Sequence, residues 1–268
     1  MFSPFQLAIK YLQYFLRASN GKGHGTHSPF VFDFITKVLN DKTNYSDYEQ
    51  VEALRRQLKA NTTVLEVEDF GAGSVTGAHK NRTVASIAKN AAKPAKYGQL
   101  LYRMVRHYRP GTVLELGTSL GITSAYLALA DPEAKVISME GAPAIAAAAG
   151  KNLQQLGIKN LRQVEGNFDS TLPALLQEWV PGTGPGLVFI DGNHREEPTL
   201  RYFRQLLPHI QNDTILVFDD IHWSREMEKA WQQVQEQEAV RCTIDLFFIG
   251  IVVFRNEFRE KQHFTIRF

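Results

Sequence analysis

Cysteine is almost absent from this chain, because only Cys242 occurs among its 268 residues. A single cysteine excludes an intrachain disulfide and a zinc site built from several cysteines, and it is typical of a reducing compartment. We therefore expect the protein in the cytoplasm. The chain also lacks any run approaching the ~20 apolar residues of a membrane span, so no span is predicted.

The N-terminal segment lacks the features of a signal peptide, because polar residues interrupt its apolar run and no small-residue cleavage site follows. Apolar side chains recur there at helical spacing, at Phe5, Ile9, Leu12 and Leu16. This pattern predicts a helix that packs on its own domain or on a second copy of the chain, as in a homodimer. A lid over an apolar substrate and contact with a membrane surface are the alternatives.

Charge of one sign is not in excess. Lys and Arg number 30 against 28 Asp and Glu, which leaves a net charge of +2 at pH 7. Dedicated nucleic-acid binders carry a strong basic excess, so we expect a small-molecule partner and no DNA, with RNA as the less favoured alternative. The 44% hydrophobic and 22% charged residues indicate a globular protein and exclude wholesale disorder.

The sequence pattern changes near residue 94. Residues 1–93 predict helices separated by polar, glycine-rich loops, with Ser28 as the N-cap of one helix and Ser46–Glu49 as the capping box of another. We expect this helical region to cover the substrate or to mediate oligomerisation. Residues 94–268 predict a single α/β domain.

Short β-rich runs alternate with helical segments in the second region. The runs are Thr112–Leu116, Lys135–Glu140, Leu161–Glu165, Leu187–Asp191 and Thr214–Phe218. This alternation predicts a doubly wound, Rossmann-like parallel sheet, whose ligands bind at the carboxyl ends of the strands. Two further runs within CTIDLFFIGIVVFRN have no helix between them and predict an antiparallel pair, and the terminal FTIRF is a candidate for another strand.

Two segments place glycines after an apolar run, at residues 63–74 and 112–130. Only the second continues into a helical stretch, so the first is interpreted as a loop over the site or as a surface excursion. Gly117 and Gly121 of the second segment have the spacing G-x-x-x-G instead of the G-x-G-x-x-G that binds dinucleotides. An NAD-type oxidoreductase is therefore disfavoured.

Two glutamates indicate the kind of ligand that this turn would hold. Glu115 lies two residues before the turn, where a carboxylate suits a cation better than a pyrophosphate. Glu140 ends the next strand, where an acidic residue can bind both hydroxyls of a ribose. A ribose-bearing ligand with positive charge fits S-adenosylmethionine.

Five motifs extend this interpretation to a family. VLELGTSLGITSAYLA, VISMEG, VEGNFDSTLPALL, LVFIDGNH and VFDDIHW resemble, in this order, the successive motifs of class I S-adenosylmethionine-dependent methyltransferases. ELGTSLGITS resembles their small-molecule O-methyltransferase branch. The resemblance covers about residues 94–255 and implies a seven-stranded sheet with an antiparallel last strand, S-adenosylmethionine as cofactor and O-methylation of a small-molecule hydroxyl. Methylation of tRNA and non-catalytic cofactor binding are the alternatives.

The resemblance also implies which residues contact the cofactor. Its methionine part would be bordered by Glu115, Gly117, Thr118, Ser119, Gly121 and Ser124. Glu140 would hold the ribose, and the adenine would be bordered by Gly166, Asn167 and Phe168. Asp191 is a further expected contact.

Three carboxylates follow two neighbouring predicted strands. Asp191 ends the fourth strand, and Asp219 and Asp220 end the fifth. Their mutual repulsion calls for a cation, and hard oxygen ligands suit Mg²⁺, Ca²⁺ or Mn²⁺. We therefore predict a divalent-metal site that lowers the pKa of an acceptor hydroxyl. Helix capping and cofactor contact are the alternative roles.

His194 follows Asp191 by three residues and resembles the base histidine of metal-dependent sugar O-methyltransferases. Since an imidazole has a suitable pKa for proton transfer at neutral pH, His194 and Asp191 are the predicted catalytic residues. A positioning or structural role is the alternative for His194. His222 and Trp223 flank the same edge and are candidates for substrate binding or packing.

Overall fold

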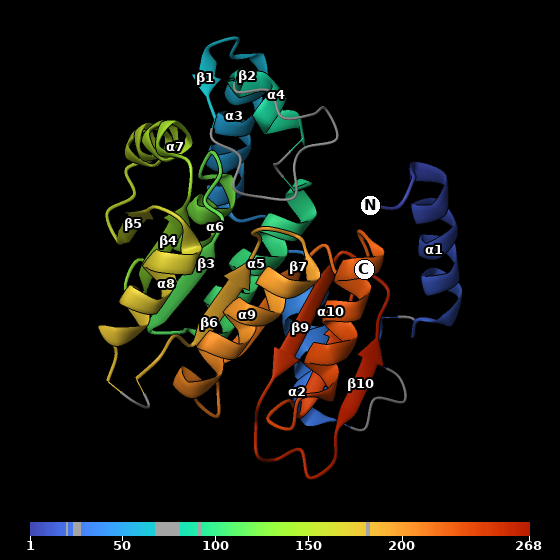
Figure 1. Ribbon diagram of the computed structural model, residues 1–268. Helices are drawn as coiled ribbons and strands as arrows, with labels where there is room; N and C mark the ends of the chain where they lie inside the picture. The colour runs from blue at the N-terminus through green and yellow to red at the C-terminus, as the bar shows by residue number, and fades with distance from the viewer. Residues whose placement is uncertain (20, 24–27, 68–80, 91–92, 181–182) are drawn as a thin grey trace. The chain divides into compact units, whose positions relative to one another are not determined.

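The computed structural model describes residues 1–19, 21–23, 28–67, 81–90, 93–180 and 183–268 (Figure 1). Its contacts divide the chain into two compact units. The middle unit is Lys42–Leu175, and the terminal unit combines Met1–Asp41 with Leu176–Phe268. The glycines of the first glycine-containing segment, Gly71 and Gly73, lie outside the described residues.

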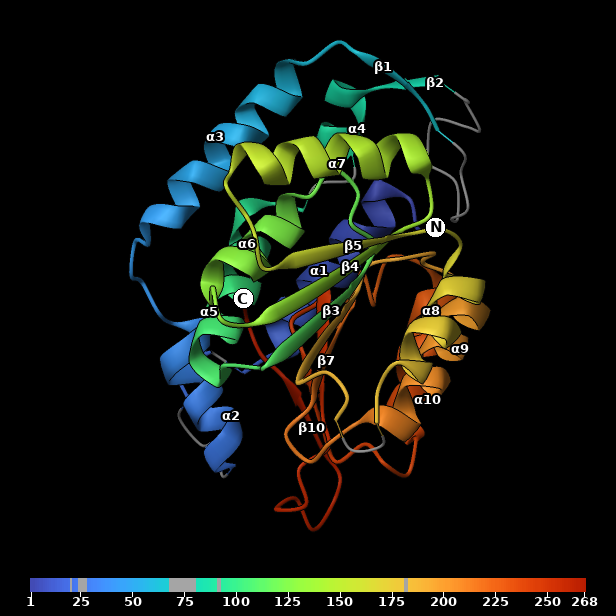
Figure 2. The same ribbon diagram turned by 90° about the vertical axis from the view of Figure 1, so that its left-hand side faces the viewer.

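The middle unit contains a three-stranded parallel arrangement in the order β3-β4-β5, formed by Thr112–Leu116, Lys135–Glu140 and Leu161–Glu165. These bounds confirm the predicted runs. Its helices are Ser46–Ala60 (α3), Val84–Asn90 (α4), Ala95–Tyr108 (α5), Ile122–Ala130 (α6) and Pro143–Gln155 (α7). Helix α7 lies alongside β4 and β5 (Figure 2). A short antiparallel pair joins Val64–Glu66 (β1) to Asn81–Thr83 (β2).

The start of α3 differs from the prediction. Ser46 is the first helical residue, and the preceding Tyr45 occupies the N-cap position without a side-chain cap. Aromatic packing accounts for this start: the Tyr45 ring lies 5.4 Å from that of Tyr48 and 5.0 Å from that of Tyr102. The predicted capping box is therefore wrong, whereas Ser28 does accept a hydrogen bond from the backbone N–H of Val31 as the predicted N-cap.

The terminal unit contains the remaining strands in the order β6-β7-β9-β8-β10. They are Leu187–Ile190 (β6), Ile215–Asp219 (β7), Cys242–Asp245 (β8), Ile249–Val253 (β9) and Gln262–Thr265 (β10). Strands β6 and β7 are parallel, and β9 runs antiparallel to both β7 and β8, as predicted for this end of the chain. Strands β3 to β9 account for the seven predicted strands, and β10 adds one, parallel to β8. The predicted α/β class is confirmed.

Helices of the terminal unit come from both of its chain segments. They are Pro4–Arg17 (α1), Pro29–Asp33 (α2), the π-helix Phe34–Leu39, Glu196–Leu206 (α9), the 3₁₀ turn Leu207–His209 and Arg225–Glu236 (α10). Helices α9 and α10 pack side by side (Figure 1). Helix Phe168–Gln177 (α8) runs across the boundary between the units.

Helix α1 confirms the predicted N-terminal helix but packs through a different face. Tyr14 and Ala18 are buried against Phe247, together with partly buried Leu7 and Tyr11. The residues from which the helix was predicted are exposed instead: Phe5 (74%), Ile9 (42%), Leu12 (58%) and Leu16 (69%). Packing on a second copy through these exposed side chains stays a prediction. The division of the chain into a helical region at residues 1–93 and an α/β domain at residues 94–268 also stays a prediction. Among the described helices, none is long and apolar enough to cross a membrane.

The contact between α5 and α6 yields a test of packing. A Cβ added at Gly98 of α5 would lie 2.5 Å from Cδ2 of Tyr126 in α6. That ring is held in place, because the Tyr126 hydroxyl donates to Glu52 Oε1 at 2.8 Å. We predict that Gly98→Ala lowers the free energy of unfolding by up to about 2 kcal/mol, since overpacking costs about 1–3 kcal/mol and better helix propensity returns about 1 kcal/mol.

Urea unfolding followed by circular dichroism measures this change. Gly111→Ala is the matched control, because a Cβ at Gly111 meets no atom within 4 Å. Equal stability of the two variants would contradict the packing argument.

Candidate functional site

The glycine turn of the middle unit lies between β3 and α6. Gly117 (φ 110°), Ser119 (φ 47°) and Gly121 (φ 81°) all have a left-handed backbone, which glycine adopts without steric cost. The backbone N–H groups of Gly117 and Thr118 both donate to the Met139 carbonyl, at 2.9 and 3.0 Å. The turn therefore lies directly beside the end of β4.

Glu140, the last residue of β4, is bound to this turn. Its Oε2 accepts the backbone N–H of Ser119 at 2.8 Å, and its Oε1 accepts that of Ala142 at 3.0 Å. Burial raises the pKa of Glu140, and the backbone donors partly offset this effect. The Glu140 carbonyl also accepts the N–H of Gly166 at 2.9 Å. The structure thus brings together residues predicted to hold three different parts of a cofactor.

Glu115 lies in a buried network of hydroxyl groups. Its side chain is fully buried in β3, and its Oε2 accepts hydrogen bonds from the hydroxyls of Ser124 and Ser138. Ser138 also lies within hydrogen-bond distance of the Thr118 hydroxyl. Sequence reasoning missed Ser138, although a serine inside the apolar run KVISM was a signal for a buried polar contact. In this arrangement Glu115 fixes the residues that flank the glycine turn.

The segment after β5 starts helix α8. Gly166 has φ 131°, and a Cβ there would lie 2.9 Å from Thr171 Cγ2. Asn167 Oδ1 accepts the backbone N–H of Asp169 at 2.9 Å, which caps the helix that begins at Phe168. The Asn167 side chain therefore has a local structural role, and adenine contact by these residues stays a prediction.

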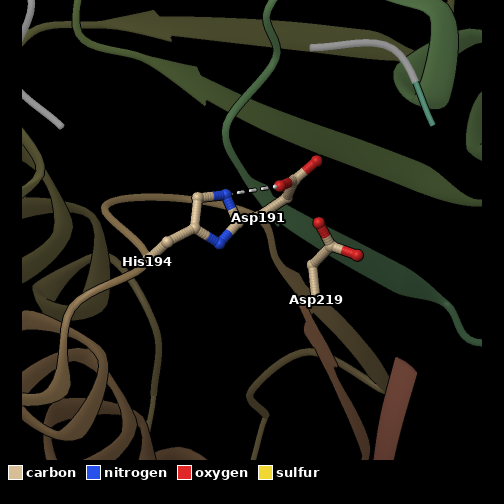
Figure 3. A group of neighbouring side chains, drawn as sticks. All are labelled: Asp191, His194 and Asp219. Atoms are coloured by element: carbon tan, nitrogen blue, oxygen red, sulfur yellow. Dashed lines mark ion pairs between the residues drawn. The ribbon is translucent and has the colours of Figure 1, made fainter. Parts of the chain in front are cut away.

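The acidic group lies within the terminal unit, at the carboxyl ends of β6 and β7. Asp191 directly follows β6, and Asp219 is the last residue of β7 and is 1% exposed. His194 Nε2 lies 3.2 Å from Asp191 Oδ1. Figure 3 shows the imidazole turned toward Asp191, with the Asp219 carboxylate beside them. Potential ligand atoms of all three residues lie within 4.8 Å of one another.

This group differs in one member from the predicted metal site. His194 joins Asp191 and Asp219. Among the described residues, Asp220 does not belong to this group of converging ligand atoms. Asp220 still acts through its charge. Burial opposes protonation of His194, yet the hydrogen bond to Asp191 and the charges of Asp191, Asp220 and Asp219 together raise its pKa to about 9. Without another cation at this site, His194 is an imidazolium at neutral pH.

Backbone strain accompanies the acidic group. Asn193 (φ 68°), His194 (φ 31°) and Asp220 (φ 54°) have the left-handed conformation that side-chain-bearing residues rarely adopt. Such strain costs on the order of 1–3 kcal/mol per residue and gathers at functional sites, where surrounding contacts enforce it. One such contact is the hydrogen bond from the Asp220 N–H to the Phe248 carbonyl, at 2.6 Å.

His222 lies in a second charged cluster beside the acidic group. Its Nδ1 lies 3.1 Å from Glu228 Oε1, and its Nε2 lies 2.8 Å from Asp245 Oδ2. Burial opposes protonation, but these two carboxylates outweigh it and raise the pKa of His222. Sequence reasoning found His222 but missed both partners, because they lie on other elements. The backbone carbonyl of the neighbouring Trp223 accepts a hydrogen bond from the backbone N–H of Phe2 at 3.1 Å.

Comparison with known proteins shows which proteins this chain is similar to. Residues 114–221 match the family model described as a methyltransferase domain. The chain is also 28% identical over 165 residues to a catechol O-methyltransferase of Mycobacterium tuberculosis, which spans 58% of this chain and 71% of that protein.

Solved structures share the fold. The SAH-bound methyltransferase PaMTH1 of Podospora anserina matches with a TM-score of 0.59 at 12% identity, covering 96% of this chain and 98% of that one. The O-methyltransferase TomG of Streptomyces achromogenes, in complex with SAM, matches with a TM-score of 0.55 at 17% identity, covering 80% and 92%. The resemblance predicted from the sequence motifs is confirmed, because residues 114–221 match the methyltransferase-domain model.

Proposed function

We propose that this protein transfers the methyl group of S-adenosylmethionine to a hydroxyl oxygen of a small molecule. The observation that carries the proposal is the Asp191–His194–Asp219 group, which places an imidazole and two carboxylates of the kind that ligate metals at the ends of neighbouring strands. Ligands of doubly wound folds bind at this end of the strands. The named activity of the Mycobacterium tuberculosis relative makes catechols the first acceptors to test. The expected location is the cytoplasm.

The cofactor proposal rests on the middle unit. Glu140 holds its carboxylate at the end of β4 through the backbone of Ser119, in a position suited to the ribose hydroxyls. The left-handed backbone at Gly117 and Gly121 forms the tight turn beside the end of β4 without strain. PaMTH1 and TomG, with the same fold, were crystallised with SAH and SAM respectively. S-adenosylmethionine supplies an electrophilic methyl group on its sulfonium when it is bound.

His194 is the proposed base of the reaction. A hydroxyl becomes a good nucleophile when its proton leaves, and a neutral imidazole can accept that proton. Asp191 orients the ring through its contact with Nε2 at 3.2 Å. Since the surrounding carboxylates raise the pKa of His194 to about 9, the base role requires that their charge be offset when substrate binds.

The residues of the acidic group fit a divalent cation. Asp191 and Asp219 supply hard oxygen ligands, which suit Mg²⁺ or Mn²⁺, and His194 stays outside this ligand set as the base. A bound cation would lower the pKa of an acceptor hydroxyl and offset the negative charge around His194. Asp191 and Asp219 would be its ligands, and Asp220 would contribute negative charge nearby.

Cofactor binding is tested by calorimetry with S-adenosylhomocysteine (SAH). We expect Glu140→Ala to weaken binding by roughly 1–3 kcal/mol, because charge-assisted hydrogen bonds to the ribose are lost. Glu133→Ala, at an exposed position of the same unit, is the control and should bind as the wild type does. Binding of NADH in place of SAH would refute the cofactor proposal.

Methyl transfer to catechols is tested with and without a chelator. We expect the chelator to abolish turnover, Mg²⁺ or Mn²⁺ to restore it, and SAH binding to survive both treatments. His194→Ala should lower kcat by roughly 10²–10⁴-fold, the range for loss of a general base. Glu197→Gln, an exposed carboxylate paired with Arg201, is the control.

Two outcomes would change this proposal. Turnover that persists in chelator, in wild type and in a folded Asp219→Ala variant, would remove the metal. Radiolabelled methyl groups that enter the RNA fraction of a cell extract, and no small molecule, would select an RNA methyltransferase.

The raised pKa of His194 predicts a pH dependence of stability in chelator-treated protein. The pKa rises from 6.5 in the unfolded chain to about 9 in the fold, so the imidazolium stabilises the fold fully below pH 6.5. That stabilisation, about 1–3 kcal/mol, is lost as the pH rises toward 9. Unfolding in urea at several pH values should show this loss in the wild type and not in His194→Gln. Parallel curves for the two proteins would count against the carboxylate contacts around His194.

A further inference from the structure

His222 is held on three sides within the terminal unit. Glu228 of α10 contacts Nδ1 at 3.1 Å, Asp245 at the end of β8 contacts Nε2 at 2.8 Å, and the ring stacks on Phe247 with centroids 5.2 Å apart. The side chain is 21% exposed. Because both ring nitrogens already have carboxylate partners, His222 has no nitrogen available as a base for a substrate.

The partners of His222 are themselves fixed by other groups. Lys10 of α1 reaches both oxygens of Glu228, at 2.9 and 3.0 Å. The second oxygen of Asp245, Oδ1, accepts the backbone N–H of Phe247 at 2.7 Å. A chain of charged contacts therefore runs from α1 through α10 and His222 to the turn that follows β8.

The turn that carries His222 begins at Asp219, one of the two carboxylates of the acidic group. Asp219 ends β7, and Asp220 follows it in a left-handed conformation. This turn contacts the turn after β8 through the Asp220 N–H, which donates to the Phe248 carbonyl at 2.6 Å, and through His222, which lies 2.8 Å from Asp245 Oδ2 and stacks on Phe247. A strained backbone persists only where neighbouring contacts over-determine it.

We propose that His222 is a positioning residue that holds the turn Asp219–Trp223 against the turn after β8, and so keeps Asp219 and the strained Asp220 in place for the acidic group. The inference rests on the proposed function in one respect, namely that Asp219 belongs to the site of methyl transfer. The placement of the turn is a property of the fold and is tested separately.

The first test measures the turn itself by amide hydrogen exchange in solution. In His222→Ala, we expect the Asp220 amide to exchange about 10–100-fold faster, because the contacts of His222 with Asp245 and Phe247 in the turn after β8 are gone. His222→Gln retains one donor and should restore part of the protection. His263→Ala is the matched control. His263 lies on the outer strand β10 of the same unit, and its Nδ1 is hydrogen-bonded to the Thr243 hydroxyl at 2.8 Å. Unchanged exchange at Asp220 in His222→Ala would overturn the proposal.

The second test measures the site by calorimetry with Mn²⁺ and by catechol methylation. We expect His222→Ala to lower Mn²⁺ affinity and kcat by about 10–100-fold, the usual effect of removing a residue that orients metal ligands, while the Kd for SAH stays within about twofold. Lys10→Met leaves His222 in place and removes the contact with Glu228, together with the contact of the Lys10 ammonium with the Phe2 ring. This variant serves if His222→Ala fails to fold, and it should show the same losses in weaker form. An equal loss of SAH binding would mean general unfolding and would overturn the positioning role.

The two proposals can fail independently. If the wild type neither binds Mn²⁺ nor methylates catechols, the proposed function fails, while faster exchange at Asp220 in His222→Ala still supports the positioning role. If the wild type is active and His222→Ala matches it in kcat, Mn²⁺ affinity and exchange, only the role of His222 is refuted.

Discussion

Negative charge crowded at the ends of two parallel strands is the constraint around which the terminal unit is arranged. The acidic group contains Asp191 and Asp219 within 4.8 Å of a shared imidazole, and Asp220 adds its charge nearby. Carboxylates at such short range repel one another unless positive charge lies among them. His194 supplies this charge when it is protonated, and a divalent cation would replace that contribution.

Negative charge is also compensated by positive groups in the cluster around His222. His222 lies between Glu228 and Asp245, and Lys10 completes the compensation from helix α1. Positive groups drawn from separate chain segments thus balance carboxylates at strand ends. Because the contacts of Lys10 with Glu228 and of His222 with Asp245 join separate segments of the sequence, the local geometry of the acidic group depends on the packing of the whole unit.

The sequence predicted the strands well for a simple physical reason. Strands covered on both faces need nearly continuous apolar runs, and β3 and β4, which have such runs, begin and end at the predicted residues. The glycine turn and Glu140 were also recognisable, since their spacing along the chain is fixed by the strand–turn–helix unit that contains them. Asp191, Asp219 and His194 were found in the same way, from their positions at strand ends.

Contacts between distant segments were beyond the reach of sequence patterns. Phe5 and Leu16 gave α1 its helical periodicity but face outward, because Tyr14 and the aromatic residues around Phe247 pack on the other side. Ser138 stood out inside the apolar run KVISM, but the run does not reveal that its partners are Thr118 and Glu115 of a neighbouring segment. The start of α3 was misjudged because tyrosine packing decided it and the local capping signal did not.

Cys242 has a practical consequence for work on this protein. The thiol is buried in β8, and burial raises its pKa to about 12, so the nucleophilic thiolate is scarcely populated at neutral pH. The natural chain therefore has no competing reactive sulfur. A cysteine introduced on the surface can be labelled selectively with a fluorophore or a spin label, and the native residue needs no replacement beforehand.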